Sequence, residues 1–122
     1  MRILNPRIHG VLDFATVAAF ALGPALFGLG GSPAAISYGL ALVHLLMTLL
    51  TRFPMGYWKQ IPFVVHGIVE LVVGIFLLIL PTIAGYAPGS PARRFYMIMG
   101  AFIVVVWALT AYGAGERETG RT

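Results

Sequence analysis

Four long apolar segments constrain this chain more than any other feature of its sequence. They cover residues 11–29, 34–50, 61–84 and 95–112, and each is close to the ~20 residues that an α-helix needs to cross a bilayer. A soluble fold of 122 residues that is 59% hydrophobic and 10% charged would leave much apolar surface in water. The sequence therefore predicts an all-α membrane protein with four transmembrane helices, in contact with the lipid bilayer.

Three pairs of residues have the form of a helix start. Asn5-Pro6, Ser32-Pro33 and Ser90-Pro91 each place a short polar side chain directly before a proline. Such a side chain caps the first free N–H groups of a helix, and proline suits the first helical position. We expect helices to begin at these three points.

The two halves of the chain resemble each other at an offset of 57 residues. Residues 8–14 (IHGVLDF) align with 65–71 (VHGIVEL), and, one inserted residue later, GSPA at 31–34 aligns with 89–92. The matched glycines and prolines that define the repeat are Gly10, Pro24, Gly28, Gly67, Pro81 and Gly85. Internal similarity of this kind predicts one membrane domain over residues 1–122, made of two tandem, parallel helical-hairpin repeats. The repeats cover about 7–52 and 64–112, and residues 113–122 form a polar tail.

Basic residues indicate the orientation in the membrane. The two termini and the central loop carry Arg2, Arg7, Arg52, Lys59, Arg117 and Arg121, whereas the other two connections carry Arg93 and Arg94 only. Because Lys and Arg are enriched in cytoplasmic loops, we expect a multi-pass protein of the cell (inner or cytoplasmic) membrane with both termini in the cytoplasm. Four aromatic residues, Tyr57, Trp58, Tyr86 and Tyr112, fall near span ends, as expected for side chains at the headgroup level.

The repeated motif also resembles a known family. Residues 7–14 (RIHGVLDF) followed by Pro24, and residues 66–70 (HGIVE) followed by Pro81, resemble the SPW-repeat family of small bacterial and archaeal membrane proteins. Of the family's Ser-Pro-Trp, only the proline is present in each half. The resemblance implies paired membrane helices in one or two repeats and brings no established biochemical activity with it.

Polar side chains within the spans are the candidate functional residues. His9 and Asp13 are four residues apart, as are His66 and Glu70, so each pair lies on one helix face. An acid inside a span costs ~2.5 to 3.5 kcal/mol on insertion scales, and such residues therefore face protein and find partners. His44, in the second span, lies at a depth suited to a hydrogen bond with Asp13. We expect these five residues to form an intramembrane polar network.

The polar network allows a structural and a functional interpretation. In the first, which we favour, each acid accepts a hydrogen bond and fixes helix packing. In the second, the His and acid residues conduct protons or ions. Haem held by paired His, or contact with a pigment or quinone, is a third possibility, but the spacing gives no ligand signature and we expect neither a metal nor a cofactor. Ala15, Ala19 and Gly23 recur every fourth residue and predict a face for close helix packing.

Several function classes are excluded or disfavoured by what the sequence contains. There is no Cys, which rules out disulfides, thiolate metal sites and Cys nucleophiles. No nucleotide-binding or hydrolase motif is present, and the net charge of +4 has no basic run interleaved with aromatics that would indicate nucleic-acid binding. We therefore expect no enzyme and no catalytic residues. The leading hypothesis is an accessory subunit that packs against itself, as a homo-oligomer, or against a larger membrane complex.

Overall fold

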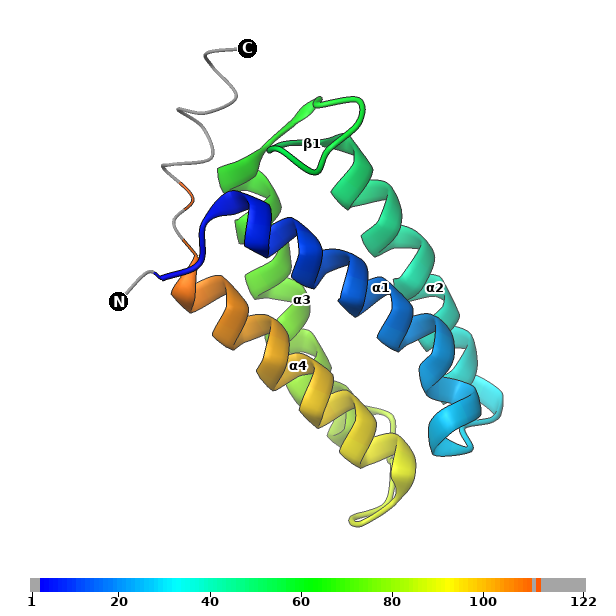
Figure 1. Cartoon of the computed structure of the whole chain (residues 1–122). Helices are drawn as coiled ribbons and strands as arrows, with labels where there is room; N and C mark the ends of the chain where they lie inside the picture. Colours follow the sequence, from blue (N-terminus) through cyan, green and yellow to red (C-terminus); the bar gives the residue numbers. More distant parts are fainter. Residues whose placement is uncertain (1–2, 111, 113–122) are drawn as a thin grey trace.

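The computed structural model describes residues 3–110 and Tyr112, and this part of the chain is helical apart from short connections and one pair of two-residue strands (Figure 1). The helices are α1 (Pro6–Phe27), α2 (Gly31–Leu50), α3 (Phe63–Ile83) and α4 (Pro91–Leu109). Strand β1 (Thr51–Arg52) pairs in parallel with β2 (Ile61–Pro62). All four helices are long and apolar enough to cross a membrane, which confirms the predicted all-helical class and the number of helices that could span a bilayer.

Two of the three predicted helix starts are confirmed. The Asn5 side chain accepts a hydrogen bond from the N–H of Ile8 at 2.9 Å, and the Ser90 hydroxyl accepts one from the N–H of Arg93 at 3.2 Å. The prediction at Ser32 is wrong, because α2 already begins at Gly31 with Gly30 as its N-cap. Gly28 ends α1 in the left-handed conformation, so the chain turns on glycines and Ser32 is helical.

The helices form two antiparallel pairs. α1 packs along α2 and α3 packs along α4, and α1 also contacts α4. The starts of α1 and α3 lie at the same end of the molecule as the ends of α2 and α4, and the turns within each pair lie at the opposite end (Figure 1). The polar tail 113–122, and with it Arg117 and Arg121, lies outside the described residues, as does Arg2.

Small residues let the helices approach each other closely. A Cβ atom on Gly100 of α4 would lie 2.8 Å from the carbonyl oxygen of Gly74 on α3, so the two backbones are in contact. Gly23, one of the predicted packing residues, faces the ring of Phe95, and a Cβ there would collide with it. Ala15 and Ala19 instead line a groove of about 220 Å³ between α1 and α4.

Two hydrophobic clusters fill the interior and leave a polar layer between them. Toward the turns within the helix pairs, the apolar core consists of Phe20, Ala41, Leu77, Leu80, Phe95, Tyr96, Met99 and Ile103. Toward the opposite end, Phe53, Phe63 and Tyr112 form a second group, called here the aromatic cluster. Buried polar side chains from α1, α2 and α3 lie between the two, where lipid and water are both excluded.

Candidate metal centre

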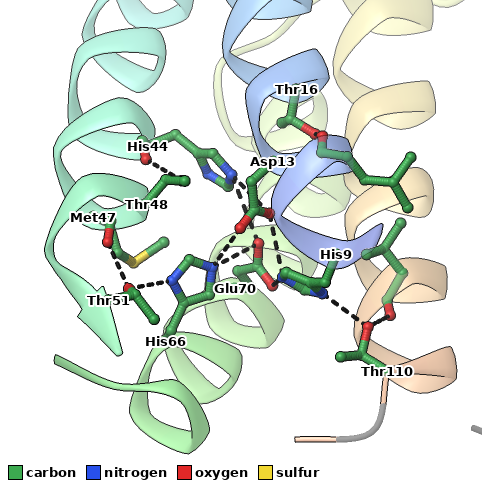
Figure 2. Close-up of polar contacts among 12 residues, drawn as sticks. His9, Asp13, Thr16, His44, Met47, Thr48, Thr51, His66, Glu70 and Thr110 are labelled. Carbon is green, nitrogen blue, oxygen red and sulfur yellow. Dashed lines mark hydrogen bonds and ion pairs between the residues drawn. The ribbon is translucent and has the colours of Figure 1, made fainter. Parts of the chain in front are cut away.

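The structure brings all five residues of the predicted polar network together at one buried point (Figure 2). α1 contributes His9 and Asp13, α3 contributes His66 and Glu70, and α2 contributes His44. None of the five is more than 6% exposed. The i, i+4 spacing places each His–acid pair on the inner face of its helix, and the two faces oppose each other.

Each carboxylate contacts all three imidazoles. The Nε2 atom of His9 lies 3.2 Å from Asp13 Oδ1 and 3.0 Å from Glu70 Oε2. The Nε2 atom of His66 lies 3.0 Å from Asp13 Oδ2 and 3.2 Å from Glu70 Oε1. His44 is slightly further away, with its Nε2 atom 3.4 Å from Asp13 Oδ1 and 3.6 Å from Glu70 Oε1. Asp13 thus has both partners expected from the sequence, His9 and His44, and a third in His66.

Two threonines determine which nitrogen of His9 and His66 carries a proton. The Nδ1 atom of His9 lies 2.8 Å from Thr110 Oγ1, whose own hydrogen is donated to the carbonyl of Val106. The Nδ1 atom of His66 lies 2.7 Å from Thr51 Oγ1, whose hydrogen is donated to the carbonyl of Met47. Because each hydroxyl hydrogen is already used, each threonine oxygen must accept from Nδ1–H. In a neutral imidazole this leaves a lone pair on Nε2.

The Nε2 atoms of His9 and His66 have no hydrogen-bond partner of acceptable geometry among the described residues, and neither does Asp13 Oδ2. All three atoms are buried and face the centre of the cluster (Figure 2). A lone pair on nitrogen placed 3.0 Å from a carboxylate oxygen is repelled by it. A cation between these atoms, either a metal ion or bound protons, removes that repulsion.

The spacing of the donor atoms suits a metal ion. One ligand atom from each of His9, Asp13, His66 and Glu70 lies within 4.8 Å of the others. Ligands about 2.1 Å from a common ion are separated by about 3.0 Å at adjacent corners of an octahedron and by about 3.4 Å in a tetrahedron. The four shortest His–acid distances, 3.0 to 3.2 Å, are in this range and involve both oxygens of each carboxylate, so Asp13 and Glu70 each offer two candidate ligand atoms.

The aromatic cluster closes one side of the centre. The Tyr112 hydroxyl donates a hydrogen bond to Glu70 Oε2 at 3.2 Å. Burial, together with the neighbouring Glu70 carboxylate, raises the pKa of Tyr112 well above its usual value, so this hydroxyl keeps its proton. Phe63 packs edge-on against the His9 imidazole, with ring centroids 5.2 Å apart. Tyr112 was expected at the headgroup level, but it is a buried partner of the centre.

The glycine after each ligating histidine has a packing role. A Cβ atom on Gly67 would lie 2.6 Å from the Tyr112 ring, and one on Gly10 would collide with Met55. The repeated His-Gly pair therefore lets Tyr112, beyond the end of α4, and Met55, in the central loop, pack closely beside the imidazoles.

No sequence pattern predicts Thr51, Thr110 or Tyr112 as partners of the centre. Thr51 and Thr110 lie just beyond the ends of α2 and α4, and their contacts with α3 and α1 depend on how the helix pairs dock. Tyr112 contacts Glu70 of α3 within its own helix pair. One sequence feature could have identified the two threonines: each directly follows the second helix of its half of the chain. Comparison of the chain with protein families, curated proteins and solved structures finds no match.

Proposed function

We propose that this chain is a membrane protein that binds one divalent transition-metal ion between α1 and α3. The Nε2 atoms of His9 and His66 and one carboxylate oxygen each from Asp13 and Glu70 are the ligands. The observation that carries the proposal is the pair of threonine contacts, which orient both imidazoles with Nδ1 toward a hydroxyl acceptor and Nε2 toward the two carboxylates. Metal-bound histidines characteristically donate their other N–H to a fixed acceptor in this way.

Charge balance also supports a metal. Two ionised carboxylates and two neutral imidazoles carry a charge of about −2, which a divalent cation neutralises completely, and a buried net charge is strongly unfavourable in a low-dielectric interior. Mixed nitrogen and oxygen donors suit iron(II), cobalt(II) or zinc(II) better than magnesium or calcium. The metal requires no Cys, in keeping with a chain that has none.

This proposal goes beyond the expectation of no metal, and it keeps the expected non-enzymatic role. An ion held by α1 and α3 joins the first helix pair to the second, as a structural subunit requires. It supports an accessory protein that packs against itself or against a larger membrane complex. Haem is disfavoured, because the His9 and His66 rings lie 5.5 Å apart, edge to face, and aromatic side chains fill the space around them.

We further propose that the two helix pairs are tandem repeats. Several contacts occur twice, at corresponding places. Leu4 forms a parallel β-bridge with Thr110, and the corresponding residues of the other halves, Ile61 and Thr51, also pair in parallel. Just beyond each first helix, the N–H of Leu29 and that of Tyr86 donate to the carbonyls of Pro24 and Pro81, each at 2.8 Å. The residues directly before Leu29 and Tyr86, Gly28 and Gly85, both have positive φ angles, of 66° and 73°. These paired contacts support the proposal that the two halves are repeats of one helical hairpin.

Metal content of the purified protein tests the proposed function. The chain, purified in mild detergent without a metal-affinity tag and dialysed, is expected to contain about one transition-metal ion per chain by mass spectrometry of the elements. The matched control variant is Ser37→Ala, which should contain as much metal as the wild type. Ser37 is also buried, but its hydroxyl donates to the Phe20 carbonyl, away from the centre. A wild-type protein that stays metal-free after incubation with iron(II), cobalt(II) and zinc(II) would show that protons fill the centre and would contradict the proposal.

The proposed orientation has a separate test. With both termini in the cytoplasm, reporter fusions after Gly31 and Gly89 are expected to report an external location, and a fusion after Met55 an internal one. The basis is the six-to-two distribution of Lys and Arg. An external location at Met55 would reverse the orientation.

A further inference from the structure

A small pocket lies beside the centre and opens on the lipid-facing side of the helices. Its volume is about 30 Å³, and it lies between α2 and α3, with Phe20 and Ile103 at its inner wall. His44 and Glu70 are the polar residues in the lining, and apolar side chains from α2 and α3 form the rest. Val43 and Val69, at the rim, are 60% and 38% exposed. Because exposed apolar side chains on a membrane helix face lipid, the pocket opens toward hydrocarbon.

From this pocket we propose that the bound metal takes a small neutral diatomic molecule, of the class of nitric oxide and dioxygen, as an additional ligand on the His44 side. The inference rests on the proposed metal centre. An octahedral ion held by four protein ligands has two further positions, as in iron sites that keep positions open for exogenous ligands. Glu70 is both a proposed ligand and part of the pocket wall, so the pocket borders the proposed centre.

The pocket selects its ligand by size and polarity. A volume of about 30 Å³ has room for two or three water-sized molecules, since one needs ~10 to 15 Å³ by this measure. Apolar gases dissolve well in hydrocarbon and cross such a lining without losing hydrogen bonds. A hydrated anion would have to shed its water first, at a cost of several kcal/mol.

His44 makes the two sides of the centre different. The position on α4 that corresponds to His44 is the buried residue Ile103. Ile103 precedes Thr110 by as many residues as His44 precedes Thr51. α2 and α3 also pack less closely than α1 and α4 do. The side between α2 and α3 is therefore the one on which an imidazole lines the pocket beside the proposed ligand position.

Nitric oxide binding to the iron(II)-loaded protein tests this inference. The full chain in detergent is loaded with iron(II) without oxygen, its iron content is measured, and nitric oxide is added. We expect the electron paramagnetic resonance signal of a high-spin, non-haem iron–nitrosyl complex. Val43→Phe and Val69→Phe should leave iron content unchanged and slow nitric oxide association about tenfold, the effect of ~1.4 kcal/mol added to the barrier. Val105→Phe, at a lipid-exposed position on α4 outside the pocket, is the matched control and should bind at the wild-type rate.

The outcomes separate the two proposals. Iron bound at one ion per chain with no nitrosyl signal overturns the diatomic ligand and leaves the metal centre standing. Failure to bind iron, cobalt or zinc overturns both. Equal slowing in Val43→Phe and Val105→Phe, or azide binding as fast as nitric oxide, contradicts an apolar route through this pocket.

Discussion

Replacing both acids of the centre by their amides, Asp13→Asn with Glu70→Gln, is expected to abolish metal binding while the protein stays folded. The double change removes two anionic ligands and would leave a bound divalent ion with an uncompensated charge of about +2 in a buried site. Removing even an outer partner of a metal ligand typically costs 10- to 100-fold in affinity, so we expect a loss greater than about 100-fold here. Competition with a metal-sensitive dye measures the affinity, and elemental analysis measures the content.

The fold should survive because amides suit the metal-free cluster. The side-chain NH₂ of Asn or Gln donates to a neutral imidazole, so the free Nε2 atoms of His9 and His66 gain a partner without any cation. The double variant should therefore be monodisperse in detergent and helical by circular dichroism. Wild-type metal content in this variant would show that the bound ion lies elsewhere. Proton flux in liposomes that is lost in the single variant Asp13→Asn, with stability unchanged, would instead favour a proton-conducting protein.

Much of the fold could be predicted because lipid simplifies the problem. In hydrocarbon, backbone groups must bond within each segment, so length and apolarity alone indicate helices. Asp13 and Glu70 could be placed inside the protein for the same reason, since an acid facing lipid is costly. The apolar segment begins only at Val11, five residues after the start of α1, because Arg7 and His9 lower the local hydropathy. The cap at Asn5 predicts the true start at Pro6.

The chemistry of the centre could not be predicted from the sequence. A histidine beside an acid on one helix suggests a hydrogen-bonded pair, and such a pair needs no metal. The metal proposal depends instead on contacts between the two helix pairs: Thr110 with His9, and Thr51 with His66. Those contacts are set by how the helix pairs dock, which apolar periodicity leaves open. The lone pairs on the two Nε2 atoms can be inferred only after a proton has been assigned to each Nδ1 atom.

Removal of the metal is expected to lower the thermal stability of the wild-type protein strongly. A ligand that binds the folded state alone stabilises it by about 4 kcal/mol when its free concentration is 1,000 times its dissociation constant. Without the ion, the carboxylates of Asp13 and Glu70 face the lone pairs of the imidazoles, so the cluster must take up protons or open. Melting of the detergent-solubilised protein, followed by circular dichroism before and after treatment with a strong chelator, measures the change, and readdition of zinc(II) should reverse it.

The amide double variant provides the internal control for this experiment. It carries no ion, so the chelator should leave its melting temperature unchanged, and it should melt above the chelated wild type because its cluster is hydrogen-bonded. If the ion pairs alone held the helices together, with protonated His9 and His66 facing ionised acids, the order would reverse. Chelation would then have no effect on the wild type, and the double variant would be the less stable protein because the charge-assisted contacts of His9 and His66 with the two acids would be lost. The relative melting temperatures of these three samples therefore distinguish a metal centre from a buried ion-pair cluster.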